Sequence, residues 1–255
     1  MFKKYSSLTI VFLCTVAICT ISSSCSKKPV DTYLSNVDTV TIINPPPPPP
    51  APTVAKRLLA LGDSYTIGQS VSVNERFPNQ TINLLNAAGA NMRYPSEIIA
   101  QTGWTTQNLL NGIANANPQP TPPYDLVTLL IGVNNQYQHL DTAQYRLQFI
   151  QCLNKAIEYS GNRKQRVFVL SIPDYGATPF GANNAVQIAL EIDRFNAINK
   201  QVCLQMSIDY TDITPSTRMA ATNPSLVAPD GLHPSGLEYA KWAVMLKVKM
   251  LALVQ

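Results

Sequence analysis

Charged side chains are scarce in this sequence. They make up 13% of the 255 residues, and 19 basic against 15 acidic side chains give a formal net charge of +4. Lys3 and Lys4 lie in a segment expected to be a removable leader, and without them 17 basic side chains face 15 acidic ones. No basic run is longer than Lys27-Lys28. The sequence therefore lacks the electrostatic footprint of a nucleic-acid-binding protein, and we expect no nucleic-acid partner.

The sequence also lacks the common cofactor motifs. Neither the G-x-G-x-x-G pattern of dinucleotide-binding folds nor the G-x-x-x-x-G-K-[ST] pattern of phosphate-binding loops occurs. No C-x-x-C pair occurs, which argues against a redox pair or a zinc site of that type. We therefore expect no metal and no cofactor.

The five cysteines divide into three groups. Cys14 and Cys19 lie in the expected leader, and Cys25 follows it directly. Cys152 and Cys203 lie on the apolar flanks of two predicted helices. Free, buried thiols are the expectation for this last pair, and a disulfide between them stays open because export would bring the chain into an oxidising compartment.

Residues 1–24 are typical of an export signal. Lys3-Lys4 precede an apolar stretch from about residue 8 to residue 21, which is too short and too early for a spanning helix. The following "ISSSCSKKP" resembles a bacterial lipoprotein signal, although Ser22 stands where such signals prefer leucine. This resemblance implies that Cys25 is lipidated and that the protein is exported in a Gram-negative bacterium to a periplasm-facing membrane or the cell surface. Ordinary signal cleavage that leaves Cys25 as a free thiol is the alternative.

Residues 25–52 are predicted to be a tether. Six consecutive prolines occupy positions 45–50, and Pro52 follows them. Prolines in series form an extended helix that rises about 3.1 Å per residue. Such a spacer would hold a folded domain away from a membrane surface, and a proline-rich ligand for a partner domain is the alternative.

From residue 53 to residue 255 the pattern alternates between apolar runs and amphipathic segments. Strands are predicted within residues 56–64, 96–103, 124–132, 165–173 and 207–214. Helices are predicted within residues 77–89, 105–117, 142–160, 185–206 and 235–255. Helices between successive strands predict one α/β domain, a three-layer α/β/α sandwich with a five-stranded parallel sheet in flavodoxin-like order.

Chemically informative residues follow the predicted strands. Ser64 ends the run "LALGDS", Gly103 lies in "QTGW", and Asn134 follows Gly132 in "LLIGVNN". In open parallel sheets, ligands bind beyond the carboxyl ends of the strands. We therefore expect these residues to meet at one edge of the sheet.

A serine nucleophile needs a base, and the chain has only two histidines. His233 follows Asp230 by three residues in "PDGLHPSG", so the carboxylate can orient one ring nitrogen while the other faces Ser64. His139 lies in the polar loop "NNQYQHLDT" and is expected at the surface. Asp63 is expected to hold the turn by backbone hydrogen bonds.

Taken together and in this order, the four segments that contain Ser64, Gly103, Asn134 and His233 resemble the SGNH hydrolases, also called GDSL-type esterases and lipases. The resemblance implies a catalytic Ser64, His233 and Asp230. It also implies an oxyanion hole formed by the N–H groups of Ser64 and Gly103 and the side-chain amide of Asn134. One departure is Asn135, which stands where the family usually has Asp and which puts the local loop geometry in question.

The resulting expectation is a serine esterase that works through an acyl-enzyme. Short acyl esters, acetylated carbohydrates and lysolipid-type esters stay open as substrates, as does the oligomeric state. The segment 68–77 and the Trp104 region are expected to shape the substrate site, with Trp104 equally suited to the core. A catalytically inactive binding protein on the same scaffold is the alternative function.

Overall fold

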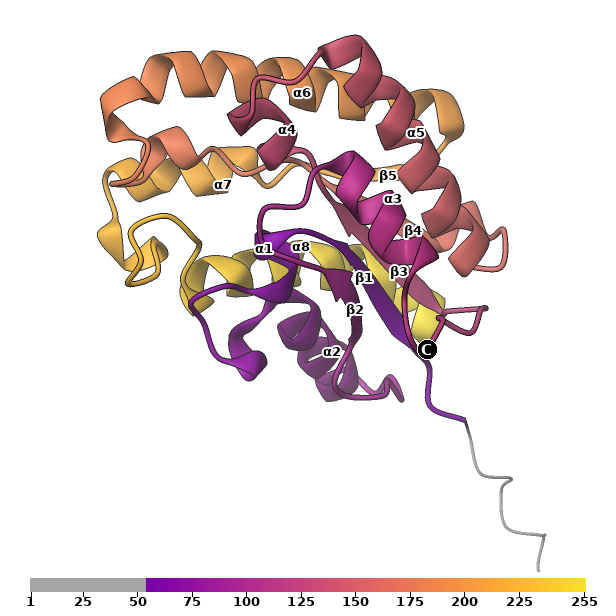
Figure 1. The fold of residues 1–255 in the computed structure, drawn as a ribbon. Helices are drawn as coiled ribbons and strands as arrows, with labels where there is room; N and C mark the ends of the chain where they lie inside the picture. Colours follow the sequence, from indigo (N-terminus) through magenta and orange to yellow (C-terminus); the bar gives the residue numbers. More distant parts are fainter. Residues whose placement is uncertain (1–53) are drawn as a thin grey trace, which may run out of the picture. The chain divides into compact units, whose positions relative to one another are not determined.

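The computed structural model describes residues 54–255 (Figure 1). The expected leader, Cys25 and the tether of residues 25–52 lie outside the described residues. Within residues 54–255, no helix combines the length and the apolar character needed to cross a membrane.

One parallel sheet forms the centre of the domain. Its strands are β1 (Leu58–Gly62), β2 (Glu97–Ala100), β3 (Leu126–Leu130), β4 (Val167–Leu170) and β5 (Asp209–Thr211), in the order β2-β1-β3-β4-β5. Every residue of β1 and β3 is buried, as expected for unbroken apolar runs covered on both faces. The predicted five-stranded parallel sheet and its flavodoxin-like order are confirmed.

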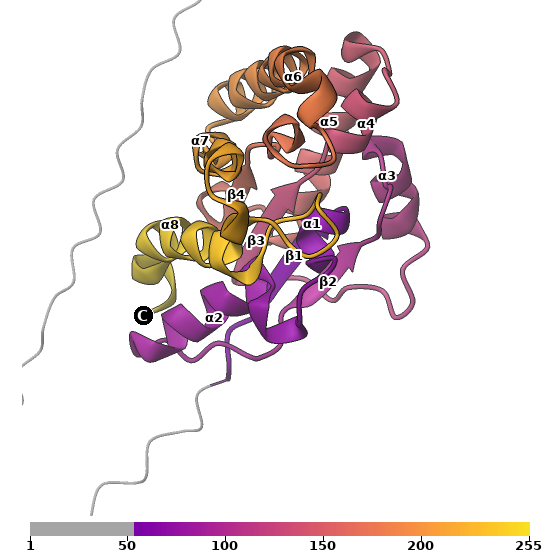
Figure 2. The same ribbon diagram turned by 90° about the vertical axis from the view of Figure 1, so that its left-hand side faces the viewer.

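Helices cover both faces of this sheet (Figures 1 and 2). Helices α2 (Phe77–Ala87) and α8 (Gly236–Val254) pack together on one face. Helices α3 (Thr106–Ala114), α5 (Thr142–Tyr159) and α6 (Ala185–Met206) cover the other. This division of the helices between the two faces follows from right-handed crossover connections. The connection from β1 to β2 crosses the sheet in the opposite direction to the later connections, so its helix lies on the opposite face.

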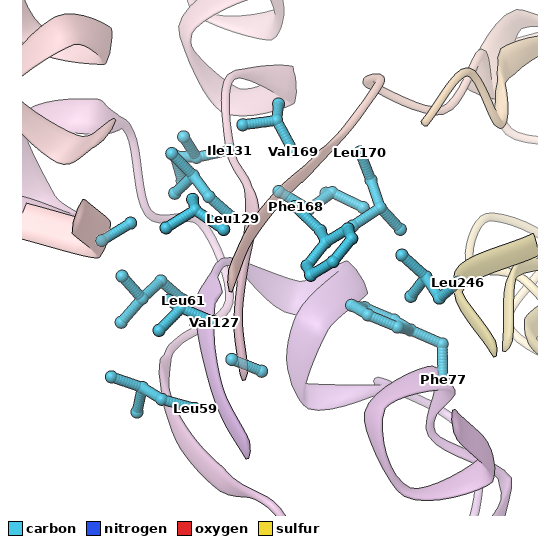
Figure 3. Packing of buried hydrophobic residues seen from close by; sticks show 14 of the residues in the cluster. Leu59, Leu61, Phe77, Val127, Leu129, Ile131, Phe168, Val169, Leu170 and Leu246 are labelled. Carbon is cyan, nitrogen blue, oxygen red and sulfur yellow. The ribbon is translucent and has the colours of Figure 1, made fainter. Parts of the chain in front are cut away.

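In the core, successive side chains along each strand point to opposite faces of the sheet. Leu61 and Leu129 lie on the same side of the sheet, whereas Phe168 lies on the side of Phe77 from α2 and Leu246 from α8 (Figure 3). All five side chains are buried to 98% or more. Truncating such a large core side chain to Ala typically costs about 2–5 kcal/mol, so these layers set the position of the strand ends where the site lies.

Three short α-helices within residues 54–255 were not predicted from the sequence: α1 (Ser64–Ile67), α4 (Val133–Tyr137) and α7 (Thr214–Arg218). Segments of four or five residues are too short to show a helical period, so apolar patterning does not reveal them. Helices α1 and α4 start just beyond β1 and β3, and they carry Ser64 and Asn134.

Cys152 in α5 and Cys203 in α6 are both free and buried. The expectation of free thiols in the core is confirmed, and the alternative of a disulfide between them is wrong for this structure.

Candidate active site

The turn that carries Ser64 depends on the glycine before it. A Cβ atom on Gly62 would lie 2.1 Å from the hydroxyl of Thr66 and 2.3 Å from the carbonyl oxygen of Leu130, so only glycine lets the end of β1 pass so close to β3. Asp63 then caps α1, since its Oδ1 accepts a hydrogen bond from the N–H of Tyr65 at 3.0 Å. Ser64 is thereby placed at the first position of α1, at the carboxyl edge of the sheet.

Ser64, His233 and Asp230 form one chain of hydrogen bonds. The Oγ atom of Ser64 lies 3.0 Å from Nε2 of His233, and Nδ1 of His233 lies 2.6 Å from Oδ2 of Asp230. A carboxylate only accepts, so Nδ1 carries the proton and Nε2 of the neutral ring accepts from the serine hydroxyl. Ser64 and His233 are only 5% and 4% exposed. The structure therefore brings together the three residues that the sequence pattern selects.

The Asp230 carboxylate is held ionised. Partial burial opposes its charge, but donors surround it: the Ser70 hydroxyl, the backbone N–H groups of His233 and Leu232, and the His233 ring. Together these hydrogen bonds outweigh burial and hold the pKa of Asp230 well below its usual range. A carboxylate in this state orients the His233 ring and would stabilise its protonated form.

The Asp63 carboxyl group, unlike that of Asp230, lies in surroundings that favour its protonated, uncharged form. Its side chain is fully buried, and within residues 54–255 its Oδ2 atom has no hydrogen-bond partner. Burial raises the pKa of Asp63 to about 7, and the hydrogen bond from the Tyr65 N–H only partly opposes this effect. Asp63 thus holds the turn through its backbone bond, as the sequence predicts, and does not take part in the Ser64 chain of bonds.

Asn134 connects the loop beyond β3 to the loop beyond β2. Its Nδ2 atom donates to the carbonyl oxygen of Trp104 at 2.9 Å, and the second hydrogen of this amide has no acceptor within the described chain. Gly132, two residues earlier, adopts a φ of +131°, and a Cβ atom there would lie 2.4 Å from the Tyr145 hydroxyl. Glycine is therefore required to start α4 against α5.

Gly103 has a left-handed φ of +81° and is exposed. It does not line the cavity beside Ser64. Over residues 54–255, the N–H groups of Ser64 and Gly103 donate no hydrogen bond. Both donors therefore remain available to a ligand.

Asn135, the departure from the family pattern, has a clear structural role. Its side chain is 1% exposed, its Oδ1 accepts from the N–H of Thr106 at 2.9 Å, and its Nδ2 donates to the Thr106 hydroxyl at 2.9 Å. These paired bonds fix the first turn of α3 to α4. The loop geometry is therefore maintained with asparagine at this position.

A cavity of about 170 Å³ opens beside Ser64. Its wall is mainly aromatic and aliphatic, and it contains no Asp, Glu, Lys or Arg side chain. The rings of Tyr137 and Phe180 each lie 6.2 Å from the ring of Tyr175, and Tyr137 and Phe180 are each 53% exposed. The residues that line the cavity are Ser64, Tyr65, Val133, Asn134, Tyr137, Tyr175, Phe180, Leu232 and His233.

Sequence reasoning placed part of this wall incorrectly. No residue of the segment 68–77 lines the cavity, and neither does Trp104, whose ring packs on Gly112 and against the core. Tyr175 and Phe180 were missed because they follow β4, a strand end with no recognisable motif. His139 is a surface residue as predicted, with 79% of its side chain exposed.

Ser70 was missed as well, since nothing in the sequence marks a serine 160 positions away as a partner of Asp230. Among the described residues, no group of three or more His, Cys, Asp and Glu side chains comes together as a metal site would require.

The structure is a three-layer α/β fold with a five-stranded parallel sheet in flavodoxin-like order, and at the carboxyl edge of this sheet lie a serine, a histidine and an aspartate joined by hydrogen bonds, the arrangement found in serine hydrolases. Residues 60–241, more than half of the chain, match the model of the GDSL-like Lipase/Acylhydrolase family. The chain belongs to this family, and family membership implies a hydrolase that acts on ester bonds.

Solved structures show the same fold. A lipase from a goat rumen metagenome is 20% identical, with a TM-score of 0.61 over 76% of this chain and 97% of that one. A lipolytic G-D-S-L family protein from Veillonella parvula is 19% identical, with a TM-score of 0.55 over 78% and 97%. A lipase/acylhydrolase from Enterococcus faecalis is 16% identical, with a TM-score of 0.57 over 78% and 97%. No curated protein sequence matches the chain.

Proposed function

We propose that this protein is a serine esterase in which Ser64, His233 and Asp230 act as a catalytic triad. The observation that carries the proposal is the unbroken chain of hydrogen bonds from Asp230 through His233 to the Ser64 hydroxyl. Ser64 is activated only when a base takes its proton, and Nε2 of His233 is placed to do so.

In the proposed reaction, the Ser64 oxygen attacks the acyl carbon while His233 takes the hydroxyl proton. The carbon–oxygen bond to the alcohol then breaks, and His233 returns the proton to the leaving alcohol. Water, deprotonated by His233, then attacks the acyl carbon of the acyl-enzyme. The bond from this carbon to the Ser64 oxygen breaks, the acid leaves, and His233 returns the proton to the Ser64 oxygen. Asp230 stays ionised throughout and holds the imidazole in its tautomer.

The oxyanion of the tetrahedral intermediate requires donors that are free in the resting enzyme. The N–H groups of Ser64 and Gly103 and the second amide hydrogen of Asn134 satisfy this requirement, because none of them has an acceptor within the described residues. Gly103 lies in the loop beyond β2 and does not line the cavity, and in this proposal its N–H donates to the oxyanion from that loop.

The cavity wall favours substrates with an uncharged group next to the scissile bond. A charged group would lose its hydration there without an ion-pair partner from the wall, which is costly. Aromatic and aliphatic side chains instead gain by covering apolar surface, at about 25 cal/mol per Å². Short acyl, acetylated carbohydrate and lysolipid-type esters all fit this description.

We also propose that the enzyme is exported and anchored to a membrane through lipid on Cys25, with residues 25–52 as the spacer. This part rests on the sequence pattern alone.

The test of the function is Ser64→Ala. The variant should lower kcat by roughly 10⁶ on a nitrophenyl acyl ester, and a fluorophosphonate reagent should add covalently to the wild-type protein only. A variant that keeps more than a tenth of the activity would exclude Ser64 as the nucleophile. A wild-type protein that neither hydrolyses esters nor reacts with the reagent would favour a binding protein on the same scaffold.

A further inference from the structure

We propose that Ser70 is a positioning residue that holds the Asp230 carboxylate in line with His233; the proposal rests on the serine-esterase function proposed above. The Ser70 hydroxyl donates to Oδ2 of Asp230 at 2.6 Å, and the same oxygen accepts from Nδ1 of His233 at 2.6 Å. The hydroxyl therefore acts on the atom that orients the imidazole.

The other bonds to this carboxylate are local. Oδ1 accepts from the N–H groups of Leu232 and His233 at 2.9 Å each, and both residues belong to the same short turn as Asp230. Within the described chain, Ser70 is the only donor to the carboxylate from outside this turn, 160 positions earlier in the sequence. It thus ties the acid of the triad to the segment that carries the nucleophile.

The backbone of Ser70 supports a specific role for its hydroxyl. Ser70 has a φ of +66°, in the left-handed region that glycine occupies freely and that is strained for other residues. Glycine would fit the backbone better at this position. A strained residue held in place by its surroundings points to a function for its side chain, and the bond to Asp230 is the contact that glycine could not make.

The loop that contains Ser70 also reaches the second strand end. Helix α1 ends at Ile67 and is capped by Gly68. Oε1 of the next residue, Gln69, accepts a hydrogen bond from the hydroxyl of Thr102, the residue before Gly103, at 2.6 Å. Ser70 does not line the cavity, and its side chain bonds to Asp230. The loss of its hydroxyl should therefore affect the rate of the chemical steps and not the affinity.

The decisive variant is Ser70→Gly, which removes the hydroxyl and suits the left-handed backbone. It should lower kcat about tenfold, the effect expected for one exposed hydrogen bond to a charged group. KM should stay within about twofold and the melting temperature should not fall. Ser70→Asn, which tolerates the same backbone and offers an amide donor, should recover part of the loss. Ser72→Gly is the matched control, because the Ser72 hydroxyl contacts Glu75 and not Asp230, and it should leave kcat unchanged.

A double mutant separates positioning from general structural effects. In an Asp230→Ala background, Ser70→Gly should cause no further loss of kcat, since the carboxylate it positions is gone. An unchanged kcat in the single variant, or a loss that persists in the Asp230→Ala background, would overturn the proposal. Failure of the esterase function itself would show separately, as hydrolysis that survives Ser64→Ala in the same assay.

Discussion

Asp63 is a buried carboxyl group with a pKa raised from 3.8 to about 7, and this predicts how the stability of the domain depends on pH. Between these two values the folded protein keeps a proton on Asp63 that the unfolded chain has lost. Stability must therefore fall as the pH rises through this window, by about 1.4 kcal/mol per pH unit. From pH 5 to pH 7 the loss from this one group amounts to about 2.3 kcal/mol, because the slope flattens as the pH approaches the folded-state pKa, and it levels off above pH 7.

Asp63→Asn removes the titration and keeps the cap. Asparagine caps helices as well as aspartate does, so its Oδ1 can still accept from the N–H of Tyr65. The new amide hydrogens occupy a buried place without an acceptor, but that cost does not change with pH. The free energy of unfolding of the variant minus that of the wild type should therefore rise by about 2–3 kcal/mol between pH 5 and pH 8.

Urea unfolding followed by tryptophan fluorescence measures this difference, with Trp242 as a fully buried reporter. All other groups titrate in both proteins, so the subtraction isolates Asp63. Asp141→Asn, the same change at the exposed cap of α5, is the matched control for replacing a capping carboxylate by an amide. A difference for Asp63→Asn that does not rise with pH would refute the inference that this carboxyl group is protonated in the folded state.

Three further changes test the site and the anchor. Asn134→Ala should lower kcat by about 10²–10³ with little change in KM, because its free amide hydrogen meets charge only in the transition state; a lower melting temperature with an unchanged rate would instead make Asn134 a turn former. Phe180→Ala should raise KM for butyryl and longer nitrophenyl esters about fivefold, since the ring covers apolar surface; equal KM values across acyl lengths would place the acyl group elsewhere. Cys25→Ser should move the protein from the membrane fraction to the soluble fraction, and a wild-type protein already found in the soluble fraction would exclude lipidation.

The fold was predictable because its signals are local and repeated. Unbroken apolar runs such as that of β3 announce buried parallel strands, and amphipathic segments between them fix the layers. The Ser64, Asp230 and His233 group was predictable for a different reason. The chain offers only two histidines; His233 follows Asp230 by three residues in a short turn, whereas His139, although Asp141 is near it, lies in a polar loop.

The remainder of the site depends on contacts that leave no trace in sequence order. Ser70 meets Asp230 across 160 positions, and Phe180 reaches the cavity from a loop held by a backbone bond between its N–H and the carbonyl oxygen of Gly231. The state of Asp63 depends on complete burial, which a three-residue motif does not reveal. The segment 68–77 was expected in the substrate wall because it follows Ser64 closely in sequence, whereas in the structure it bonds to Asp230 through Ser70 and to Thr102 through Gln69.

The bond between Ser64 and His233 joins residues 169 positions apart, so the active site is closed by the two ends of the domain. Contacts of such long sequence separation form late and slowly in folding, because the chain must first lose the entropy of closing a large loop. A chain interrupted before α8 lacks the docking of α8 on α2 that holds this end of the domain in place. We therefore expect a chain that ends before α8 to be inactive toward esters, and we expect activity to return during refolding only when the whole domain has formed.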